Sequence, residues 1–240
     1  MSYIKSYCNI TPEGATLNGE VIFQLSKTPS PTKEEFVMND LFSALYEHLG
    51  IDYRKFFKMD ALSKLGFLAS ELLLEGADRE VPKPDMGIIL FNSSSSLEAD
   101  RNFQQTIRNQ DDFYPSPSEF VYTLPNIVTG EIAIRNKIFG ETAFYVMRHL
   151  ESEYISQIID DTLYCAGLKY VLAGWVEVDV PNNSLNCLMI LCTAERGKPS
   201  VNESDSYLPT GYLKNIHTGN NEELDLYRIT DFYMSDLYNN

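Results

Sequence analysis

Histidines and cysteines are the side chains of this 240-residue chain best suited to act as bases, nucleophiles or metal ligands. The three histidines, His48, His149 and His217, are isolated, and no pair of them has metal-ligand spacing. The cysteines have no repeated spacing, and their neighbours are apolar, which predicts buried free thiols in a reducing cytosol. They are Cys8, Cys165, Cys187 and Cys192. The sequence therefore predicts no metal site and no cofactor.

Four consecutive serines, Ser93–Ser96, lie between an apolar run at Met86–Phe91 and a polar helical pattern at Leu97–Arg108. Serine hydroxyls and the first amides of a helix can together bind a phosphate group. Serine is also a common residue at helix N-caps. We favour the second interpretation, a capped turn before a helix.

A third pattern extends from residue 126 to residue 177. Asn126 is followed four residues later by Gly130 and ten further residues on by Gly140, and the pattern ends in Gly174-Trp-Val-Glu177. It resembles the nucleophile segment of the β-ketoacyl-acyl-carrier-protein synthases of the thiolase superfamily. All the spacings of that family hold here without a gap, and they place His149 at the position of the nucleophilic cysteine.

The residue type at position 149 matters because a condensing enzyme holds its acyl chain as a thioester on a thiolate. An imidazole cannot form a thioester, and acyl-imidazoles hydrolyse readily. The resemblance therefore implies a catalytically inactive, ketosynthase-like subunit, a pseudoenzyme with no catalytic residue assigned. We interpret His149 as a helix-cap or interface residue. Arg148 is interpreted first as an ion-pair or interface residue and second as a contact for an acyl phosphopantetheine.

The apolar periodicity predicts alternating strands and helices. Strands are expected at residues 3–9, 21–25, 86–91, 142–147, 170–176 and 185–192, and helices at residues 33–49, 52–75, 97–108 and 149–166. Within the second helix, Lys58-Met59-Asp60 resembles the Arg-Met-Asp that opens a core helix in ketosynthases. The resemblance implies an α/β fold that is one half of a thiolase-like fold, a five-stranded mixed sheet with helices packed on it.

This ketosynthase-like domain is expected to span residues 1–195, followed by a polar, acidic C-terminal extension at residues 196–240. The extension is too short to form the second half of a condensing enzyme, which carries the other catalytic groups. The domain is long enough to bury a substantial core. A complete condensing reaction is therefore not expected from this chain.

The formal net charge of −15 argues against nucleic acid as a partner, because phosphates are bound by clustered Lys and Arg. Acyl carrier proteins are themselves acidic, so we expect one to interact with this chain only indirectly. The longest apolar stretches, such as Val121–Val128, are too short to span a membrane. Residues 1–25 have no apolar h-region of a secretory signal. We therefore expect a cytoplasmic protein that does not bind membranes.

A short subgroup of the ketosynthase family resembles this chain, namely chain-length-factor-type partners in aryl polyene, flexirubin and dialkylresorcinol biosynthesis. That resemblance implies a heterodimer with a full-length ketosynthase, and a homodimer is also permitted. In thiolase-fold dimers the strand before the nucleophile pairs across the two-fold axis. Thr142, Phe144 and Val146 are therefore the expected interface residues. An unpaired apolar edge strand would favour such an association.

Four aromatic residues in and after a Pro-containing loop are candidates to line the partner's acyl tunnel, together with Arg148 and His149. The simpler interpretation of these aromatics is ordinary core. They are Phe113, Tyr114, Phe120 and Tyr122. Two other functions stay open: a stand-alone acyltransferase or decarboxylase with His149 as its base, and a non-catalytic binding protein outside lipid synthesis.

Overall fold

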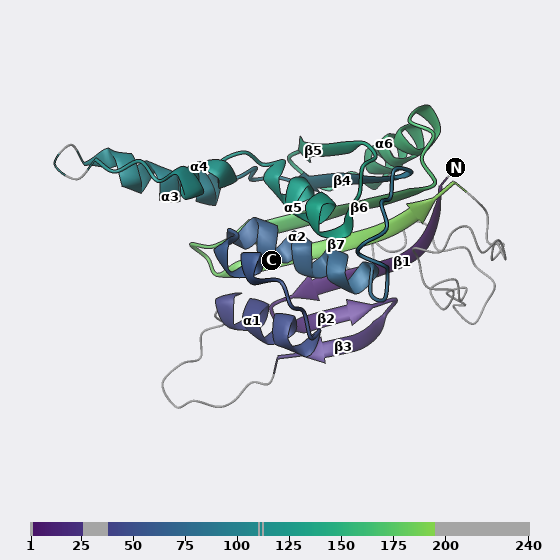
Figure 1. Ribbon diagram of the computed structural model, residues 1–240, viewed down its shortest axis with the longest axis horizontal. Coiled ribbons are helices and arrows are strands. Elements are labelled where there is room, and N and C mark those ends of the chain that lie inside the picture. Colours follow the sequence, from purple (N-terminus) through teal and green to yellow (C-terminus); the bar gives the residue numbers. More distant parts are fainter. Residues whose placement is uncertain (1, 26–37, 110, 112, 195–240) are drawn as a thin grey trace.

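The computed structural model describes residues 2–25, 38–109, 111 and 113–194. Its strands form one mixed sheet in the order β3-β2-β1-β7-β6-β4-β5 (Figure 1). The strands are β1 (Tyr3–Thr11), β2 (Gly14–Leu17), β3 (Glu20–Gln24), β4 (Met86–Asn92), β5 (Thr142–Val146), β6 (Tyr170–Asp179) and β7 (Ser184–Thr193). The helices are α1 (Met38–His48), the 3-10 helix η1 (Arg54–Lys58), α2 (Ala61–Leu73), α3 (Leu97–Arg108), α4 (Pro117–Tyr122), α5 (Ile127–Asn136) and α6 (Ser152–Cys165).

Strand β4 lies between β5 and β6 and is parallel to both, whereas the other neighbouring strands are antiparallel. Every residue of β4 is buried, as its continuous apolar run predicts for a strand that is covered on both faces. Helices α1, α2 and α5 pack on one face of the sheet and α6 on the other. The position of β5 at the edge of the sheet follows from this order.

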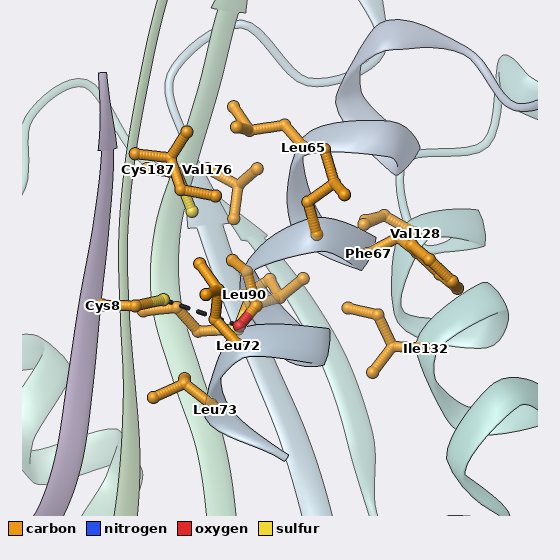
Figure 2. Close-up of a cluster of buried hydrophobic side chains, with 14 of the residues drawn as sticks. Cys8, Leu65, Phe67, Leu72, Leu73, Leu90, Val128, Ile132, Val176 and Cys187 are labelled. Carbon is orange, nitrogen blue, oxygen red and sulfur yellow. Dashed lines mark hydrogen bonds between the residues drawn. The ribbon is translucent and has the colours of Figure 1, made fainter. Parts of the chain in front are cut away.

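Helix α2 is the centre of the larger core. Eleven of its residues are buried, and they pack against the sheet on one side and α5 on the other. In Figure 2, Phe67 of α2 lies near Val128 of α5, and Leu72 lies near Cys8 of β1. The Cys8 thiol donates a weak hydrogen bond of 3.5 Å to the backbone oxygen of Ala69. Burial raises the pKa of this thiol to about 12.

The mixed sheet was correctly predicted, but its size was not, because the sheet has seven strands and the predicted sheet had five. In the β1–β2–β3 meander, β3 matches the strand expected at residues 21–25, whereas β2 was not predicted. Leu17 of β2 pairs with Glu20 of β3, and the two residues between them, Asn18 and Gly19, have φ values of 54° and 83°. Two positive φ values are what a type I′ hairpin loop requires, and Asn-Gly is its strongest sequence signal. The Asn18-Gly19 dipeptide of this hairpin is therefore a signal that can be read from the sequence.

Two predicted helices differ from the observed ones at their N-terminal ends. The helix predicted at residues 52–75 is divided, because α2 starts only after Asp60, whose carboxylate accepts a hydrogen bond of 3.0 Å from the backbone N–H of Ser63. Asp60 thus caps a core helix, as the Lys58-Met59-Asp60 motif predicted. The helix predicted at 149–166 starts at Ser152, because the backbone of Glu151 is still extended. His149 therefore precedes the helix and does not belong to its first turn.

Three of the four predicted buried thiols are buried, and all four cysteines are free. Cys165 is the exception, since it ends α6 on the outward side and is exposed. Tyr154 on the same helix is also exposed, whereas Ile155, Ile159 and Leu163 are buried. Within the described residues, no helix is both long enough and apolar enough to cross a membrane. The C-terminal extension predicted at 196–240 lies outside the described residues.

Candidate functional site

Strand β5 is an open edge. Among the described strands it pairs with β4 alone, in the parallel register Ile88↔Thr142 to Asn92↔Val146. Phe144 packs against the large core, while Thr142 and Val146 are exposed. Natural edge strands usually carry a charge, a proline or a bulge that prevents pairing with another chain. β5, with the sequence Thr-Ala-Phe-Tyr-Val, has none of these.

The hydrogen bonds of β5 to β4 determine which of its backbone groups face outward. The N–H of Ile88 donates to the carbonyl oxygen of Glu141 (2.9 Å), and the N–H of Met147 donates to that of Asn92 (2.9 Å). In a parallel ladder, the odd-numbered residues of β5 therefore face β4. The N–H and C=O groups of Thr142, Phe144 and Val146 point away from it. The three predicted interface residues are thus the three with outward-facing backbone groups.

The segment before β5 fixes its position. The N–H of Gly140 donates to the carbonyl oxygen of Met86 at 3.0 Å, and a Cβ on Gly140 would lie only 2.2 Å from that oxygen. A glycine at position 140 is therefore required for β5 to approach β4. Lys83 is fully buried, and its ammonium group donates to the backbone oxygens of Asp78 (2.6 Å), Val81 (3.0 Å) and Asn136 (2.9 Å). It holds the loop before β4 against the end of α5.

Helices α3 and α4 form an arm that projects from the body beside the β4–β5 end of the sheet (Figure 1). The two helices contact each other through Phe103 and Phe120, whose ring centroids are 5.3 Å apart. Ala99 is the buried residue of α3. The Ser96 hydroxyl donates to the backbone oxygen of Thr123 at 2.5 Å and ties the two ends of the arm to the same point.

The four predicted tunnel aromatics separate into two groups. Phe113, Tyr114 and Phe120 of the arm are 62%, 77% and 53% exposed, so their interpretation as ordinary core is wrong. Tyr122 is buried at the root of the arm, where its hydroxyl donates to Glu131 Oε1 at 3.3 Å. Burial, with the charge of Glu131, raises the pKa of Tyr122. Glu131 also forms an ion pair of 2.7 Å with Lys55.

Further exposed apolar side chains lie on the segments that follow the arm in the sequence and precede β5. They are Val121 and Leu124 at the end of the arm, Ile134 on α5, and Phe139 before β5. Helix α5 contacts both β4 and β5. We call the arm, the outer side of α5 and the edge of β5 together the β5 surface. Exposed apolar side chains that gather into a large patch usually mark binding sites for other proteins.

His149 and Arg148 lie just after β5 and are both exposed. His48, at the end of α1, packs its ring against Phe23 of β3 at the opposite edge of the sheet. Six strand spacings separate the two edges, which is roughly 29 Å. His48 therefore cannot assist His149, and His217 lies outside the described residues. Within the described residues, no three His, Cys, Asp or Glu side chains are grouped to hold a metal ion.

The serines form the turn before α3, as favoured from the sequence, but Ser96 at the N-cap of α3 makes no side-chain capping hydrogen bond. Glu177 accepts hydrogen bonds from the N–H and the hydroxyl of Ser93, both at 2.7 Å, and from the hydroxyl of Ser94. A carboxylate at this point would repel a phosphate. The turn, Asp60 and Glu177 border a pocket of about 240 Å³, which none of the predicted tunnel residues lines. The sequence motif located Glu177 but did not indicate its partners, which lie 84 and 83 residues away.

Sequence comparisons and structural comparisons give different results. No family model and no curated protein matches the sequence. Among solved structures, the chain is similar to the ishigamide ketosynthase/chain length factor, with a TM-score of 0.56 and 19% identity over 81% of this chain and 63% of that chain. It thus spans less than two thirds of that neighbour.

Two further solved structures are similar. A ketosynthase in complex with its chain length factor, from Xenorhabdus doucetiae, has a TM-score of 0.50 and 14% identity, covering 79% of this chain and 77% of that chain. A β-ketoacyl synthase from Burkholderia phymatum STM815 has a TM-score of 0.52 and 11% identity, covering 80% and 58%. The chain therefore has the thiolase-like fold of ketosynthases and chain length factors, as its sequence motif predicted.

Proposed function

We propose that this chain, which has the fold of ketosynthases and chain length factors, is a non-catalytic subunit of the chain-length-factor type. Its partner is a full-length ketosynthase in pigment, lipid or polyketide biosynthesis, and the two pair through the β5 surface. The observation that carries this proposal is the open edge of β5, whose outward N–H and C=O groups lie at Thr142, Phe144 and Val146.

Association is supported by the surface that surrounds β5. The arm aromatics are exposed in the isolated chain, and burying them against a partner would remove a large apolar area from water. Gly130 gives an independent indication, because a Cβ at this position would meet nothing within 4 Å among the described residues. The packing of the chain itself therefore does not require a glycine there. A glycine would, however, leave room for the approach of a partner's backbone.

The geometry of β5 also fits pairing about a two-fold axis. If β5 pairs antiparallel with the equivalent strand of a thiolase-fold partner and Phe144 lies at the axis, Thr142 faces the partner's counterpart of Val146. All outward N–H and C=O groups of both strands can then form hydrogen bonds. The same arrangement permits a homodimer, since such an interface is self-complementary.

The absence of catalysis is the second part of the proposal. His149 precedes α6, and the residues of a second half that would complete a condensing site are not identified in this chain. We expect no covalent acyl adduct and no 3-oxoacyl product when the isolated chain is incubated with acyl- and malonyl-carrier protein. His149→Cys should not restore activity. Mass spectrometry of the intact protein tests both statements, and an adduct on the unmodified chain would establish a catalytic role.

The pairing is tested by co-expression with the ketosynthase encoded beside this chain, followed by size-exclusion chromatography with light scattering. Val146→Asp should abolish the complex, because an interface strand cannot bury an unpaired charge. Val21→Asp is the matched control. Both valines are exposed, Val146 to 55% and Val21 to 68%, and both lie on edge strands, at opposite ends of the sheet. Equal amounts of complex from the two variants would place the interface elsewhere.

A further inference from the structure

The sheet face opposite α1, α2 and α5 has little helical cover for its apolar content. Its buried side chains extend over β1, β7, β6 and β4 and include Tyr7, Trp175 and Leu188. Within the described part of the chain, the helical side chains in this cluster all come from α6. Helix α6 packs mainly on β6 and reaches the start of β1, where Asp160 accepts a hydrogen bond of 2.6 Å from Ser2 N–H. The middle of β1 and the first half of β7 therefore need a second cover.

Three buried polar atoms lie on this part of the face, and none has a hydrogen-bond partner among the described residues. They are Asn9 Oδ1, Thr16 Oγ1 and Asn186 Oδ1. Asn9 pairs with Thr16 of β2 on one side and with Leu188 of β7 on the other. Paired residues share a face of the sheet, and so do Asn186 and Leu188, which are two positions apart. The three side chains therefore form one group, which we call the Asn9 patch.

Buried polar side chains almost always have a hydrogen-bond partner, so each exception calls for an explanation. Asn9 is only 7% exposed, and water does not reach its side-chain oxygen. Three such atoms beside the apolar side chains of Tyr7 and Leu188 make a mixed surface. A segment that brings both apolar side chains and hydrogen-bond donors would fit it.

The C-terminal part of the chain starts at this face. Strand β7 ends at Thr193, opposite Tyr3 of β1, and Ala194 packs against the same apolar cluster. Residues 195–221 could extend over as much as roughly 90 Å, at about 3.3 Å per residue, which is several times the length of β1. Any segment beyond residue 221 is therefore able to reach the Asn9 patch.

One segment of that region has a suitable sequence. Residues 222–238 carry apolar side chains at the spacing that is typical of one face of a helix. They are Leu226, Ile229, Tyr233 and Leu237. Thr230 lies on the same face and, with Tyr233, supplies hydroxyl donors. The opposite face carries Arg228 and Ser235, together with Leu224 and Phe232. An apolar strip with this spacing requires a surface to pack on.

We propose that residues 222–238 dock on the Asn9 patch of the same chain and complete the core of this face. Tyr233 and its apolar neighbours cover the middle of β1 and β7, and hydroxyl groups of the segment donate to the unpaired oxygens. The inference concerns a different surface from β5 and applies to the isolated chain. If residues 222–238 do not dock on the Asn9 patch, the proposed pairing with a ketosynthase still stands. If the chain does not pair with a ketosynthase, the docking still stands.

Photo-crosslinking of the full-length chain tests the docking directly. A p-benzoylphenylalanine placed at Tyr233 should form adducts with peptides of residues 3–17 or 184–192, identified by mass spectrometry. The same group at Ser235, on the opposite face, is the matched control and should give several-fold fewer adducts. A mixture of ¹⁴N- and ¹⁵N-labelled protein separates adducts within one chain from those between chains. Adducts to a second molecule or to the arm, or equal yields at the two positions, would overturn the proposal.

Trp175, the single tryptophan of the chain, provides a second measurement. It lies in the cluster on this face and is 6% exposed. Tyr233→Glu should increase the quenching of its fluorescence by acrylamide several-fold, while Ser235→Glu, which introduces the same charge, should not. Circular dichroism of both variants establishes that the body remains folded. Unchanged quenching in Tyr233→Glu would contradict the docking.

Discussion

Helices α2 and α3 are almost equal in length, at 13 and 12 residues, and both have apolar side chains at helical spacing. Eleven residues of α2 are buried, whereas Ala99 is the buried residue of α3. The difference arises from position and not from helical pattern. Helix α2 lies between the sheet and α5, and α3 lies on an arm beside an unpaired strand.

The comparison shows which part of the molecule is complete in itself. Side chains of α2 contribute to the stability of this chain, while the exposed side chains of the arm can contribute only when something else covers them. We therefore expect substitutions in α2 to change the folding of the isolated chain. Substitutions in the arm should instead change its association. Residues of the same type in α2 and α3 make matched pairs, whose substitution tests whether the two helices contribute differently to folding.

The largest effect on folding is expected for the buried carboxylate of α2. Glu71 binds Arg135 through two hydrogen bonds of 3.2 Å and Arg79 through an ion pair of 3.3 Å. Glu71→Ala should lower the free energy of unfolding by about 3 kcal/mol, because it removes the carboxylate that binds two partly buried guanidinium groups. Glu98→Ala in α3 removes a partly exposed pair with Arg101 and should cost less than about 0.5 kcal/mol. Urea denaturation measures both, and similar losses would remove the distinction between the helices.

Apolar truncation gives the second test. Leu65 of α2 is fully buried and Leu97 of α3 is 45% exposed. Leu65→Ala should lower the free energy of unfolding by about 2–5 kcal/mol, through lost burial and the cavity that remains. Leu97→Ala should cost less than about 1 kcal/mol. A large loss from Leu97→Ala in the isolated chain would mean that the arm is already packed without a partner.

The arm aromatics should matter for products more than for folding. Phe120→Ala should lower the free energy of unfolding of the isolated chain by about 1 kcal/mol or less. In the heterodimer, trimming Phe113, Tyr114 or Phe120 to Ala should lengthen the products if these side chains close the partner's acyl tunnel. Buried Tyr122→Phe, which removes only a hydroxyl, is the control. A product distribution unchanged in all three Ala variants would assign chain-length control to the partner.

The smallest expected effect is the pH dependence contributed by the cap of α2. Burial raises the pKa of Asp60 despite the hydrogen bonds from Ser63. The folded chain therefore binds this proton more tightly than the unfolded chain does. Asp60 should thus reduce stability as the pH rises from the unfolded pKa of about 3.9 through the folded pKa. Relative to Asp60→Asn, the unmodified chain should lose stability over that interval. A difference that is constant with pH would show that the Asp60 charge has no such effect.

Patterns local in sequence could predict a large part of the fold. The apolar run at Met86–Phe91 gave β4, and the family spacing gave the strand at residues 142–147. The Asn18-Gly19 hairpin could also have been predicted from its dipeptide. The hydrogen bonds of Glu177 with Ser93 and Ser94 could not, because they join residues far apart in sequence.

The sequence also could not predict that the side chains of the arm are exposed. Phe113, Tyr114 and Phe120 belong to residue types that usually fill cores, so their sequence could not reveal that the body leaves them uncovered. Burial depends on what packs against a helix, and that surface is not encoded next to it. For the same reason, Thr142, Phe144 and Val146 could be predicted as interface residues from the resemblance but not from periodicity.

Amide hydrogen exchange resolved at single residues of β5 tests the central claim most directly. In the monomeric chain, the outward N–H groups of Thr142, Phe144 and Val146 should exchange rapidly, while Ala143, Tyr145 and Met147, which face β4, are protected. In the complex with the ketosynthase, the three outward amides should become protected as strongly as the inward ones. Rapid exchange of all three outward amides in a complex of verified mass would contradict pairing through β5.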